Sequence, residues 1–356
     1  MQKIRVLIID DSAFMRRAIK QMVETDQDIE VVGVARDGIE GVDMALSLTP
    51  DVVTMDIEMP RMNGLEAIEH IMDRSPRPIL VVSSLTTEGA KATFEALDKG
   101  AADYISKNLT NSAFDMMKIQ TELIGKLKAL SRKRNALFGI GAARRPASVK
   151  TAPLPPAPQS RRIFATQKIA FVAIGASTGG PKAIQEVLMN LPGELTTPFL
   201  IAIHMPKAFT WAFAERLNDF SKIPVREAQN GEPVKSSQIL LTPGGMQTRI
   251  RRKGLSDFYI EINDNPANSV YKPSVDIAML SVAECYPGRS MGVVLTGMGH
   301  DGLEGVRAIR QKGGKSIAQS EETCTVYGMP KAIVDAGLAD KVVALDRIAG
   351  EIINMI

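Results

Sequence analysis

A stretch without acidic residues in the middle of the chain divides the sequence into two parts. No Asp or Glu occurs between Glu122 and Glu186, while residues 126–168 contain eleven lysines and arginines. Within this stretch, residues 139–162 hold five prolines scattered among Gly, Ala, Ser and Arg. Such a segment has too little apolar surface to offset the entropy lost on folding. The sequence therefore predicts two folded domains joined by a partly extended linker, which would either be a passive spacer or keep two weakly docking domains close together.

Length and charge exclude several classes of protein. At 356 residues the chain is long enough for two domains, each with its own core. The net charge of +3 becomes −8 when the eleven positive charges of residues 126–168 are left out, so the folded parts are not expected to bind nucleic acid. The sequence has no apolar run long enough to span a membrane, no recognisable signal peptide, and only two cysteines, Cys285 and Cys324. We therefore expect a cytoplasmic protein with reduced thiols.

Short apolar runs alternate with helical patterns through residues 1–125. The runs that read as buried strands are Ile4–Ile9, Val31–Ala35, Val52–Met55, Ile79–Ser83 and Tyr104–Ser106. Because a helical pattern follows each run, this domain is predicted to be an α/β fold with a doubly wound parallel sheet. In such a sheet, functional groups gather at the carboxyl ends of the strands.

Polar side chains stand at these strand ends. Asp10 and Asp11 follow the first run, and Asp56 follows the third. Ser83 ends the fourth run and Lys107 follows the fifth. Three carboxylates at one sheet edge repel each other unless a cation joins them, and oxygen ligands favour Mg²⁺. A carboxylate beside Mg²⁺ and a lysine can accept a phosphoryl group, whereas the alternative is that these Asp residues only cap helices.

The motifs around these residues resemble the response regulator receiver domain over roughly residues 1–125. They are Asp10-Asp11, MDIEMPRMNG around Asp56, VVSSLT around Ser83, and GAADYISK with Tyr104 and Lys107. The resemblance implies that Asp56 accepts the phosphoryl group and that Asp10, Asp11 and Asp56 bind Mg²⁺. It also implies that Lys107 binds the phosphate and that Ser83 and Tyr104 form a switch pair. One position departs from the family pattern, because Asn108 follows Lys107 where receivers commonly have proline.

The second domain begins with a strand that runs into a glycine-rich turn. Residues 168–176 are predicted to form a strand and residues 182–191 a helix, with Ser177-Thr178-Gly179-Gly180-Pro181 between them. Pro181 suits a first helical turn, and free N–H groups at a helix N-terminus favour an oxyanion beside Ser177. The spacing Gly175-x-Ser177-x-Gly179 also fits a nucleophile elbow. Glycine-rich turns of this kind can equally bind phosphate or only reverse the chain.

A nucleophilic serine needs a base, and the chain has only three histidines. His70 lies on a predicted helix of the first domain, and His300 lies in a loop after a later strand. His204 follows the next apolar run after Ser177, so both are expected at the same sheet edge. Asp301 could orient an imidazole from another strand, which makes Ser177, His204 and Asp301 a candidate nucleophile, base and acid. The alternative for His204 is a buried or helix-capping histidine. The chain order Ser…His…Asp disfavours the α/β-hydrolase fold.

Two other functions are disfavoured. Gly297-x-Gly299-x-x-Gly302 follows a strand and resembles a dinucleotide-binding fingerprint, but Asp301 inside the turn would repel a pyrophosphate. A DNA-binding regulator is disfavoured because the second domain is a long α/β pattern, far larger than a helix-turn-helix, and because the basic residues lie in the predicted linker.

The second half resembles the catalytic domain of the CheB family of chemotaxis protein-glutamate methylesterases. The motifs that carry the resemblance are GASTGGPKAI, HMPKAFTWAFAERL, KPSVDIAMLSVAE, GVVLTGMGHDG and AQSEETCTVYGMPKAIVDAG. It implies a receiver over 1–125, a helix end and linker over 126–165, and a doubly wound parallel-sheet catalytic domain over 166–356. It further implies Ser177 as nucleophile, His204 as general base, Asp301 as the orienting acid, Thr178 beside the nucleophile, and the backbone of Met298 at the oxyanion.

The same resemblance implies substrates, partners and control. The family hydrolyses glutamyl methyl esters on chemoreceptors and deamidates particular glutamines there, without a metal for that chemistry. A chemotaxis histidine kinase would be the phosphodonor, and contact with membranes would be only through receptor arrays. An unphosphorylated receiver docked over the catalytic face would block access, so residues 160–356 alone should be active without a phosphodonor. The alternative function is a phosphorylation-gated binding module without turnover. One stretch departs from the family: residues 242–248 are TPGGMQT where relatives often have APGDRHM.

Overall fold

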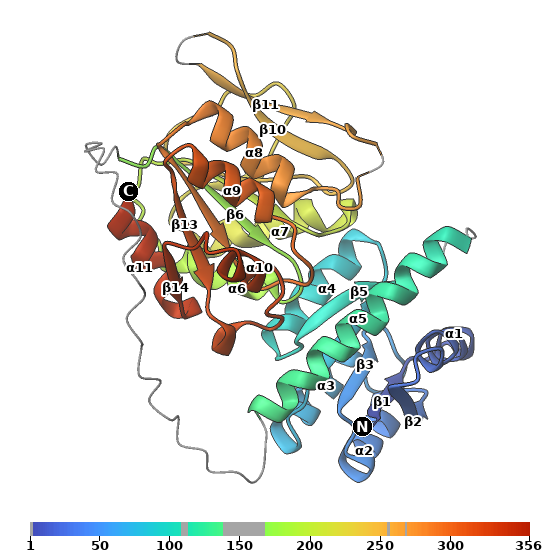
Figure 1. Cartoon of the computed structure of the whole chain (residues 1–356). Coiled ribbons are helices and arrows are strands. Elements are labelled where there is room, and N and C mark those ends of the chain that lie inside the picture. Colours follow the sequence, from blue (N-terminus) through green and yellow to red (C-terminus); the bar gives the residue numbers. More distant parts are fainter. Residues whose placement is uncertain (1–2, 108–112, 138–167, 255–256, 268) are drawn as a thin grey trace, which may run out of the picture.

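The computed structural model describes residues 3–107, 113–137, 168–254, 257–267 and 269–356. Two α/β domains, each built around a parallel sheet, pack against each other (Figure 1). The predicted fold class, two doubly wound parallel-sheet domains, is confirmed. The linker predicted at 139–162 and the departure at Asn108 both lie outside the described residues.

The N-terminal domain has a five-stranded parallel sheet in the order β2-β1-β3-β4-β5. Its strands are β1 (Ile4–Ile9), β2 (Ile29–Ala35), β3 (Val52–Asp56), β4 (Ile79–Ser83) and β5 (Asp103–Ser106). The strand order reverses between β1 and β3, so the residues that follow these two strands meet at the topological switch point. This edge is where Asp10, Asp11 and Asp56 were predicted to gather.

Helices cover both faces of this sheet. They are α1 (Ala13–Glu24), α2 (Gly38–Leu48), α3 (Gly64–Arg74), α4 (Thr87–Asp98) and α5 (Ala113–Leu137). The first four begin at a side-chain cap, because Ser12, Asp37, Asn63 and Thr86 each accept a hydrogen bond from a backbone N–H of the first turn. Helix α5 runs on past residue 125, so the first part of segment 126–165 is helical in the structure.

The C-terminal domain has a seven-stranded parallel sheet in the order β14-β13-β12-β6-β7-β9-β8. Its strands are β6 (Phe171–Ala176), β7 (Phe199–Ile203), β8 (Val225–Glu227), β9 (Ile239–Leu241), β12 (Ser290–Val294), β13 (Lys315–Gln319) and β14 (Lys341–Val343). The order reverses between β6 and β12. The residues after these strands, which include Ser177 and Asp301, therefore share one sheet edge with His204 after β7.

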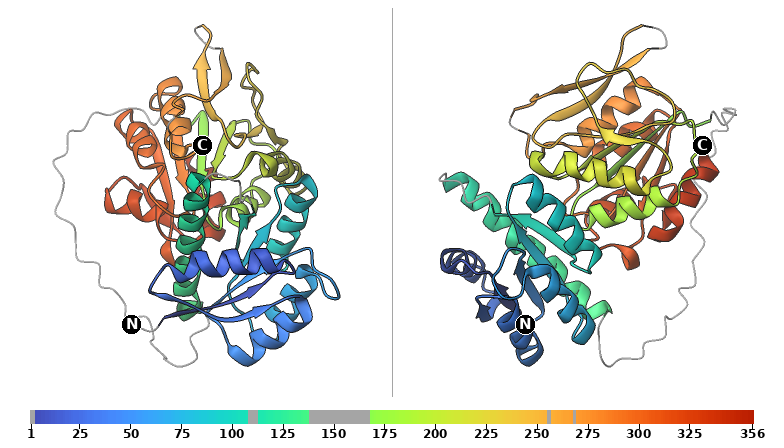
Figure 2. Two further views of the ribbon diagram at one scale, coloured as in Figure 1. Left: turned by 90° about the vertical axis from the view of Figure 1, so that its right-hand side faces the viewer. Right: turned by 180° about the vertical axis from the view of Figure 1, so that it is seen from behind.

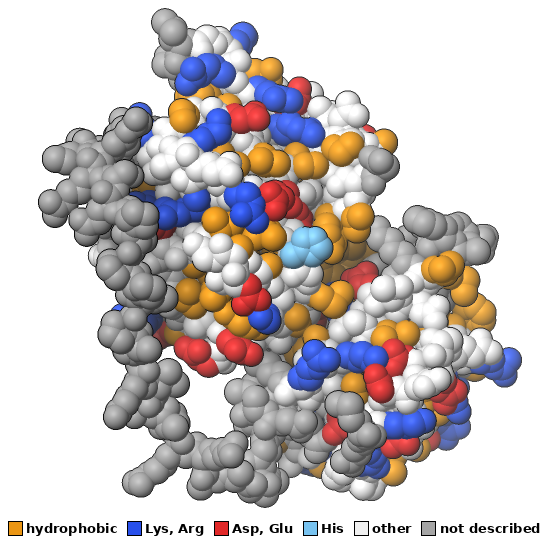
Figure 3. Space-filling view, viewed as in Figure 1, with side chains coloured by type: hydrophobic (Ala, Val, Ile, Leu, Met, Phe, Trp, Pro, Cys, Tyr) orange, Lys and Arg blue, Asp and Glu red, His pale blue; other side chains and the backbone are white. Residues whose placement is uncertain are grey.

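Helices flank this sheet, and a hairpin that the sequence patterns did not predict extends from it. The helices are α6 (Gly180–Met189), α7 (Lys207–Phe220), α8 (Val275–Cys285), α9 (Leu303–Gln311), α10 (Met329–Asp335), α11 (Leu345–Met355) and the short 3₁₀ helix η1 (Glu321–Thr323). The antiparallel strands β10 (Gln247–Arg252) and β11 (Phe258–Asn263) form the hairpin, and β10 packs on α8. Lys and Arg side chains gather over this hairpin at the top of Figure 3.

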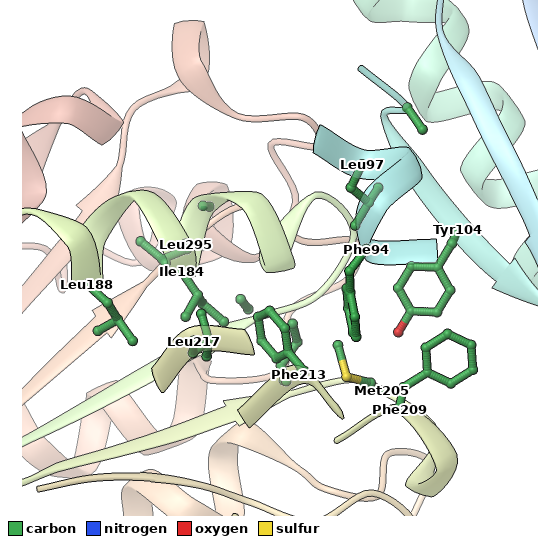
Figure 4. Packing of buried hydrophobic residues seen from close by; sticks show 14 of the residues in the cluster. Phe94, Leu97, Tyr104, Ile184, Leu188, Met205, Phe209, Phe213, Leu217 and Leu295 are labelled. Atoms are coloured by element: carbon green, nitrogen blue, oxygen red, sulfur yellow. The ribbon is translucent and has the colours of Figure 1, made fainter. Parts of the chain in front are cut away.

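Aromatic side chains of the two domains pack together in one buried cluster (Figure 4). Phe94 of α4 stacks on Phe213 of α7 with ring centroids 5.2 Å apart, and it meets Phe209 of α7 edge-on at 6.2 Å. Tyr104 of β5 lies nearly parallel to Phe209 at 4.9 Å. These four side chains are at most 5% exposed. Helix α4 packs on α7, and the ribbons in Figure 2 show the two domains against each other from two further sides.

No helix in the described part of the chain is long and apolar enough to cross a membrane. The two cysteines, Cys285 and Cys324, are both buried.

Candidate active site

Ser177 lies directly after β6, at the turn that leads into α6. Its backbone N–H donates to the carbonyl of Thr296 at 3.0 Å, which ties the turn to the loop after β12. Gly179 caps α6 with a φ of +74°, a conformation in which glycine is favoured. A Cβ at Gly179 would also collide with the side chain of Thr325. The predicted strand, tight turn and helix are therefore all present.

His204 joins Ser177 to Asp301. Its Nδ1 lies 3.1 Å from Ser177 Oγ, and its Nε2 lies 2.7 Å from Asp301 Oδ2. An ionised carboxylate only accepts hydrogen bonds, so the neutral imidazole carries its proton on Nε2. Nδ1 is then free to accept the proton of the Ser177 hydroxyl. The arrangement can activate a serine oxygen as a nucleophile.

Asp301 is fixed by the beginning of helix α8 as well as by His204. Its carboxylate accepts hydrogen bonds from Ser274 Oγ (2.9 Å), Val275 N (2.7 Å) and Asp276 N (3.0 Å). Burial alone would raise the pKa of Asp301, but the hydrogen bond from His204 and the amides of α8 lower it overall. Asp301 therefore stays ionised beside the imidazole.

Asp276, at the beginning of α8, in turn binds the segment that follows Asp301. Its Oδ1 accepts hydrogen bonds from Gly302 N (2.9 Å) and Gly305 N (2.7 Å) at the beginning of α9. Asp301 thus binds the beginning of α8, which contains Asp276, and Asp276 binds the beginning of α9, which follows Asp301. Burial, and after it the negative charge of Asp301, raise the pKa of Asp276 to about 6. The KPSVD motif contains Asp276, but sequence reasoning assigned no role to this residue.

Thr178 and Met298, the other two predicted site residues, lie beside this group. Thr178 is 2% exposed, and its carbonyl accepts a hydrogen bond from Thr296 Oγ1 at 2.9 Å. Met298 is half-buried in the loop between β12 and Asp301. Of the other two histidines, His300 is exposed and His70 is half-buried on α3 of the N-terminal domain.

Besides Asp276, two further residues near the site could not be identified from the sequence. The ring of Tyr271 stacks on the imidazole of His204, with centroids 4.1 Å apart and planes 3° from parallel. Gln247, inside the divergent segment 242–248, is fully buried. Its Nε2 donates a hydrogen bond to the carbonyl of Tyr271, and its Oε1 accepts one from the backbone N–H of Ser274. The only sequence signal was the departure of that segment from the family pattern.

The predicted acidic cluster assembles at the edge of the N-terminal sheet. Oxygens of Asp10, Asp11 and Asp56 lie within 4.8 Å of one another. Lys107 Nζ reaches Asp56 Oδ2 at 2.6 Å and Asp10 Oδ2 at 3.2 Å. Burial raises the pKa of Asp56 to about 6, although the hydrogen bond from Lys107 opposes this rise. This cluster is typical of a Mg²⁺ site in a receiver domain.

The two predicted switch residues, Ser83 and Tyr104, contact different parts of the structure. Ser83 Oγ lines the pocket that contains Asp56 and Lys107, and it donates to the carbonyl of Gly89 at 3.1 Å. Tyr104 instead packs its ring on Phe209 of the other domain.

The N-terminal domain also touches the loops that surround Ser177. Asp103 Oδ1 lies 3.5 Å from the backbone N–H of Gly179, at the N-terminus of α6. The side chain of Met298 lies against Gly125 of α5, where a Cβ would come within 3.0 Å of it. Gly179 also lines a cavity of about 460 Å³ that is formed by residues of both domains, among them Ala101 and Thr296.

Comparisons with known proteins match each half of the chain to a known family. The CheB methylesterase family matches residues 172–352, and the response regulator receiver domain matches residues 6–117. A protein-glutamate methylesterase/protein-glutamine glutaminase of Oleidesulfovibrio alaskensis is 47% identical, with 99% of each chain covered. One of Geobacter sulfurreducens is 44% identical, covering 99% of this chain and 98% of that protein. The crystal structure of the Thermotoga maritima CheB methylesterase catalytic domain is 34% identical with a TM-score of 0.51, covering 53% of this chain and 99% of that chain.

The protein is a response regulator with a hydrolase as its effector domain. Its receiver carries an acidic cluster, and its second α/β domain holds a serine, a histidine and an aspartate that are hydrogen-bonded in line. The chain belongs to the CheB family of chemotaxis protein-glutamate methylesterases/protein-glutamine glutaminases. Its N-terminal domain is a response regulator receiver domain.

Proposed function

We propose that this enzyme removes methyl groups from glutamate esters of chemoreceptors, and deamidates particular glutamines there, with Ser177 as nucleophile, His204 as base and Asp301 as orienting acid. The observation that carries the proposal is the hydrogen-bonded line from Ser177 Oγ through the imidazole to Asp301. The enzyme would work in the cytoplasm and reach membranes only through receptor arrays.

The reaction follows from the two nitrogens of His204. As Ser177 Oγ forms a bond to the ester carbonyl carbon, its proton moves to Nδ1, and Asp301 stabilises the imidazolium through Nε2. The negative charge on the carbonyl oxygen is met by backbone N–H groups near Met298 and Thr178. When the C–OCH₃ bond breaks, Nδ1 returns the proton to the leaving oxygen and methanol departs. A water molecule then repeats the sequence on the acyl-enzyme, which releases glutamate and restores the Ser177 hydroxyl. With glutamine as substrate, ammonia leaves in place of methanol.

The receiver would supply the control. Asp56 is the expected phospho-acceptor, with a chemotaxis histidine kinase as donor. Asp10, Asp11 and Asp56 fit Mg²⁺ because their carboxylate oxygens converge within 4.8 Å. When bound, the ion supplies positive charge that offsets the charge on the phosphoryl oxygens. Lys107 already lies at this point and would bind a phosphoryl oxygen once Asp56 is modified.

Docking of the receiver would connect Asp56 to Ser177. Asp103 and Gly125 of the receiver lie against the turn of Gly179 and the loop of Met298, which are the segments next to the candidate nucleophile. A receptor helix needs open access to this edge of the sheet. Phosphorylation would lower the docked population, for which a difference of a few kcal/mol between the two states is sufficient.

The test is methanol release from methylated chemoreceptor membranes by the intact chain. We expect release by the wild type and none by Ser177→Ala, with the Asn variant of Asp301 strongly reduced. Equal release by wild type and Ser177→Ala would refute the assignment of the nucleophile. Binding of receptor membranes without any release would instead favour the binding module considered from the sequence.

A further inference from the structure

The imidazole of His204 is held on both edges and on one face. Its edges meet Ser177 Oγ and Asp301 Oδ2 through Nδ1 and Nε2. One face lies against the ring of Tyr271 at 4.1 Å, with the two planes 3° apart. The His204 side chain is only 13% exposed. An imidazole that is confined in this way cannot tilt out of the line between the serine and the carboxylate without moving Tyr271.

The backbone of Tyr271 is itself anchored by two side chains. Its carbonyl accepts hydrogen bonds from Gln247 Nε2 at 2.7 Å and from Ser269 Oγ at 2.9 Å. The other end of the same amide, Gln247 Oε1, accepts from Ser274 N at 2.9 Å. Ser274 Oγ in turn donates to Asp301. The buried Gln247 therefore fixes both Tyr271, which stacks on His204, and Ser274, which binds Asp301.

The hydroxyl of Tyr271 lies at the backbone of Gly299. A Cβ at Gly299, whose φ is +86°, would come within 3.1 Å of Tyr271 Oη. The absence of a side chain at Gly299 therefore leaves room for the hydroxyl. Burial, followed by the charge of Asp301, raises the pKa of Tyr271, and the phenol is neutral at neutral pH. The face of its ring carries partial negative charge, as in other aromatic side chains.

We propose that Tyr271 is a positioning residue for His204, whose ring face holds the imidazole in line with Ser177 and Asp301 and stabilises the imidazolium that forms when Ser177 loses its proton. The inference rests on the proposed function. A cation over an aromatic face gains about 0.5–1 kcal/mol at exposed sites and about 2 where water is excluded. The imidazolium exists only after substrate attack, so the ring acts on kcat and leaves KM unchanged.

Three variants separate the ring face from the hydroxyl and from plain packing. Tyr271→Phe keeps the ring and removes the hydroxyl. Tyr271→Leu and Tyr271→Met keep apolar cover over His204 and remove the aromatic face, and the flexible Met side chain provides a second test if Leu does not fold. Thermal unfolding of each full-length variant reports whether the fold survives.

Two rates are measured on each variant with acetyl phosphate and Mg²⁺ present: methanol release from receptor membranes, and labelling of Ser177 by a fluorophosphonate probe. Ser177→Ala, which cannot be labelled there, identifies the labelled site. The probe needs no receptor, so loss of methanol release in a wild type that still labels would count against the proposed substrate and not against Tyr271.

We expect Tyr271→Phe to keep both rates within about twofold. The Leu and Met variants should lose about five- to tenfold in kcat and in labelling rate, with KM unchanged, which corresponds to the gain of a partly buried cation–ring contact. Wild-type rates in folded Leu and Met variants would overturn the proposal. Equal losses in the Phe and Leu variants would overturn it as well, because the hydroxyl contact with Gly299 would then carry the effect.

Discussion

We predict that Phe94→Ala weakens the docking of the receiver on the catalytic domain. Phe94 of the receiver is 2% exposed and packs on Phe209 and Phe213 of the catalytic domain. Burying a Phe side chain fully is worth about 1.5–3 kcal/mol, and each ring pair adds about 0.5–1.5 kcal/mol. Part of this burial lies within the receiver itself, so we assign about 2 kcal/mol of docking free energy to the contact. Phe94→Ala should then lower the docking equilibrium constant about 30-fold.

The assay is methanol release by the unphosphorylated, full-length protein. If the docked receiver blocks Ser177, Phe94→Ala raises this basal rate towards the phosphorylated rate, and a phosphodonor then adds little. Phe94→Leu keeps apolar volume without the ring pairs and should give an intermediate rate. Ile39→Ala is a matched control, because Ile39 is 41% exposed on α2, which faces away from the catalytic domain (Figure 1). A folded Phe94→Ala protein with the basal rate of the wild type would refute the docking argument.

Two further predictions concern residues around the triad. The pKa of Asp276 in the folded protein is about 6, above the ordinary 3.8, so the wild type loses stability as pH rises from about 4 through 6. Asp276→Asn keeps an acceptor oxygen and avoids that loss, and its advantage in urea unfolding should grow over this range to about 1–2 kcal/mol after allowance for partial exposure. A pH-independent difference would contradict this reasoning. Gln247→Leu leaves Ser274 N without its acceptor, which should cost about 1–3 kcal/mol in the same assay and slow the labelling of Ser177. Gln311→Leu, at an exposed position, is the control, and equal stability of the two Leu variants would contradict the role of Gln247.

Much of both sites could be predicted from the sequence because parallel strands end at a common edge. Asp10 and Asp11 follow β1 and Asp56 ends β3, the two strands that flank a switch point, and the oxygens of these residues do converge. Ser177 and His204 follow neighbouring strands, so their meeting required only the correct strand order. The residue types at strand ends therefore carried most of the information, since the sheet itself brings them together.

Residues that act through loops or through the other domain could not be predicted in this way. Tyr271 reaches His204 from a loop before α8, and no periodicity fixes where such a loop lies. Gln247 stood out only as a departure from the family pattern. Phe94 and Phe209 belong to ordinary amphipathic helices, where a buried aromatic residue is expected in the core of its own domain. No sequence pattern distinguishes that core from a contact between domains.

We propose that Asp56 controls Ser177 through docking of the receiver. The most direct test is methanol release from methylated receptor membranes by the full-length protein, with and without acetyl phosphate and Mg²⁺, beside Asp56→Asn. We predict a low rate without the phosphodonor, a rise with it in the wild type, and no rise in Asp56→Asn. The same rate in the wild type with and without the phosphodonor would contradict the claim, even if release still depended on Ser177.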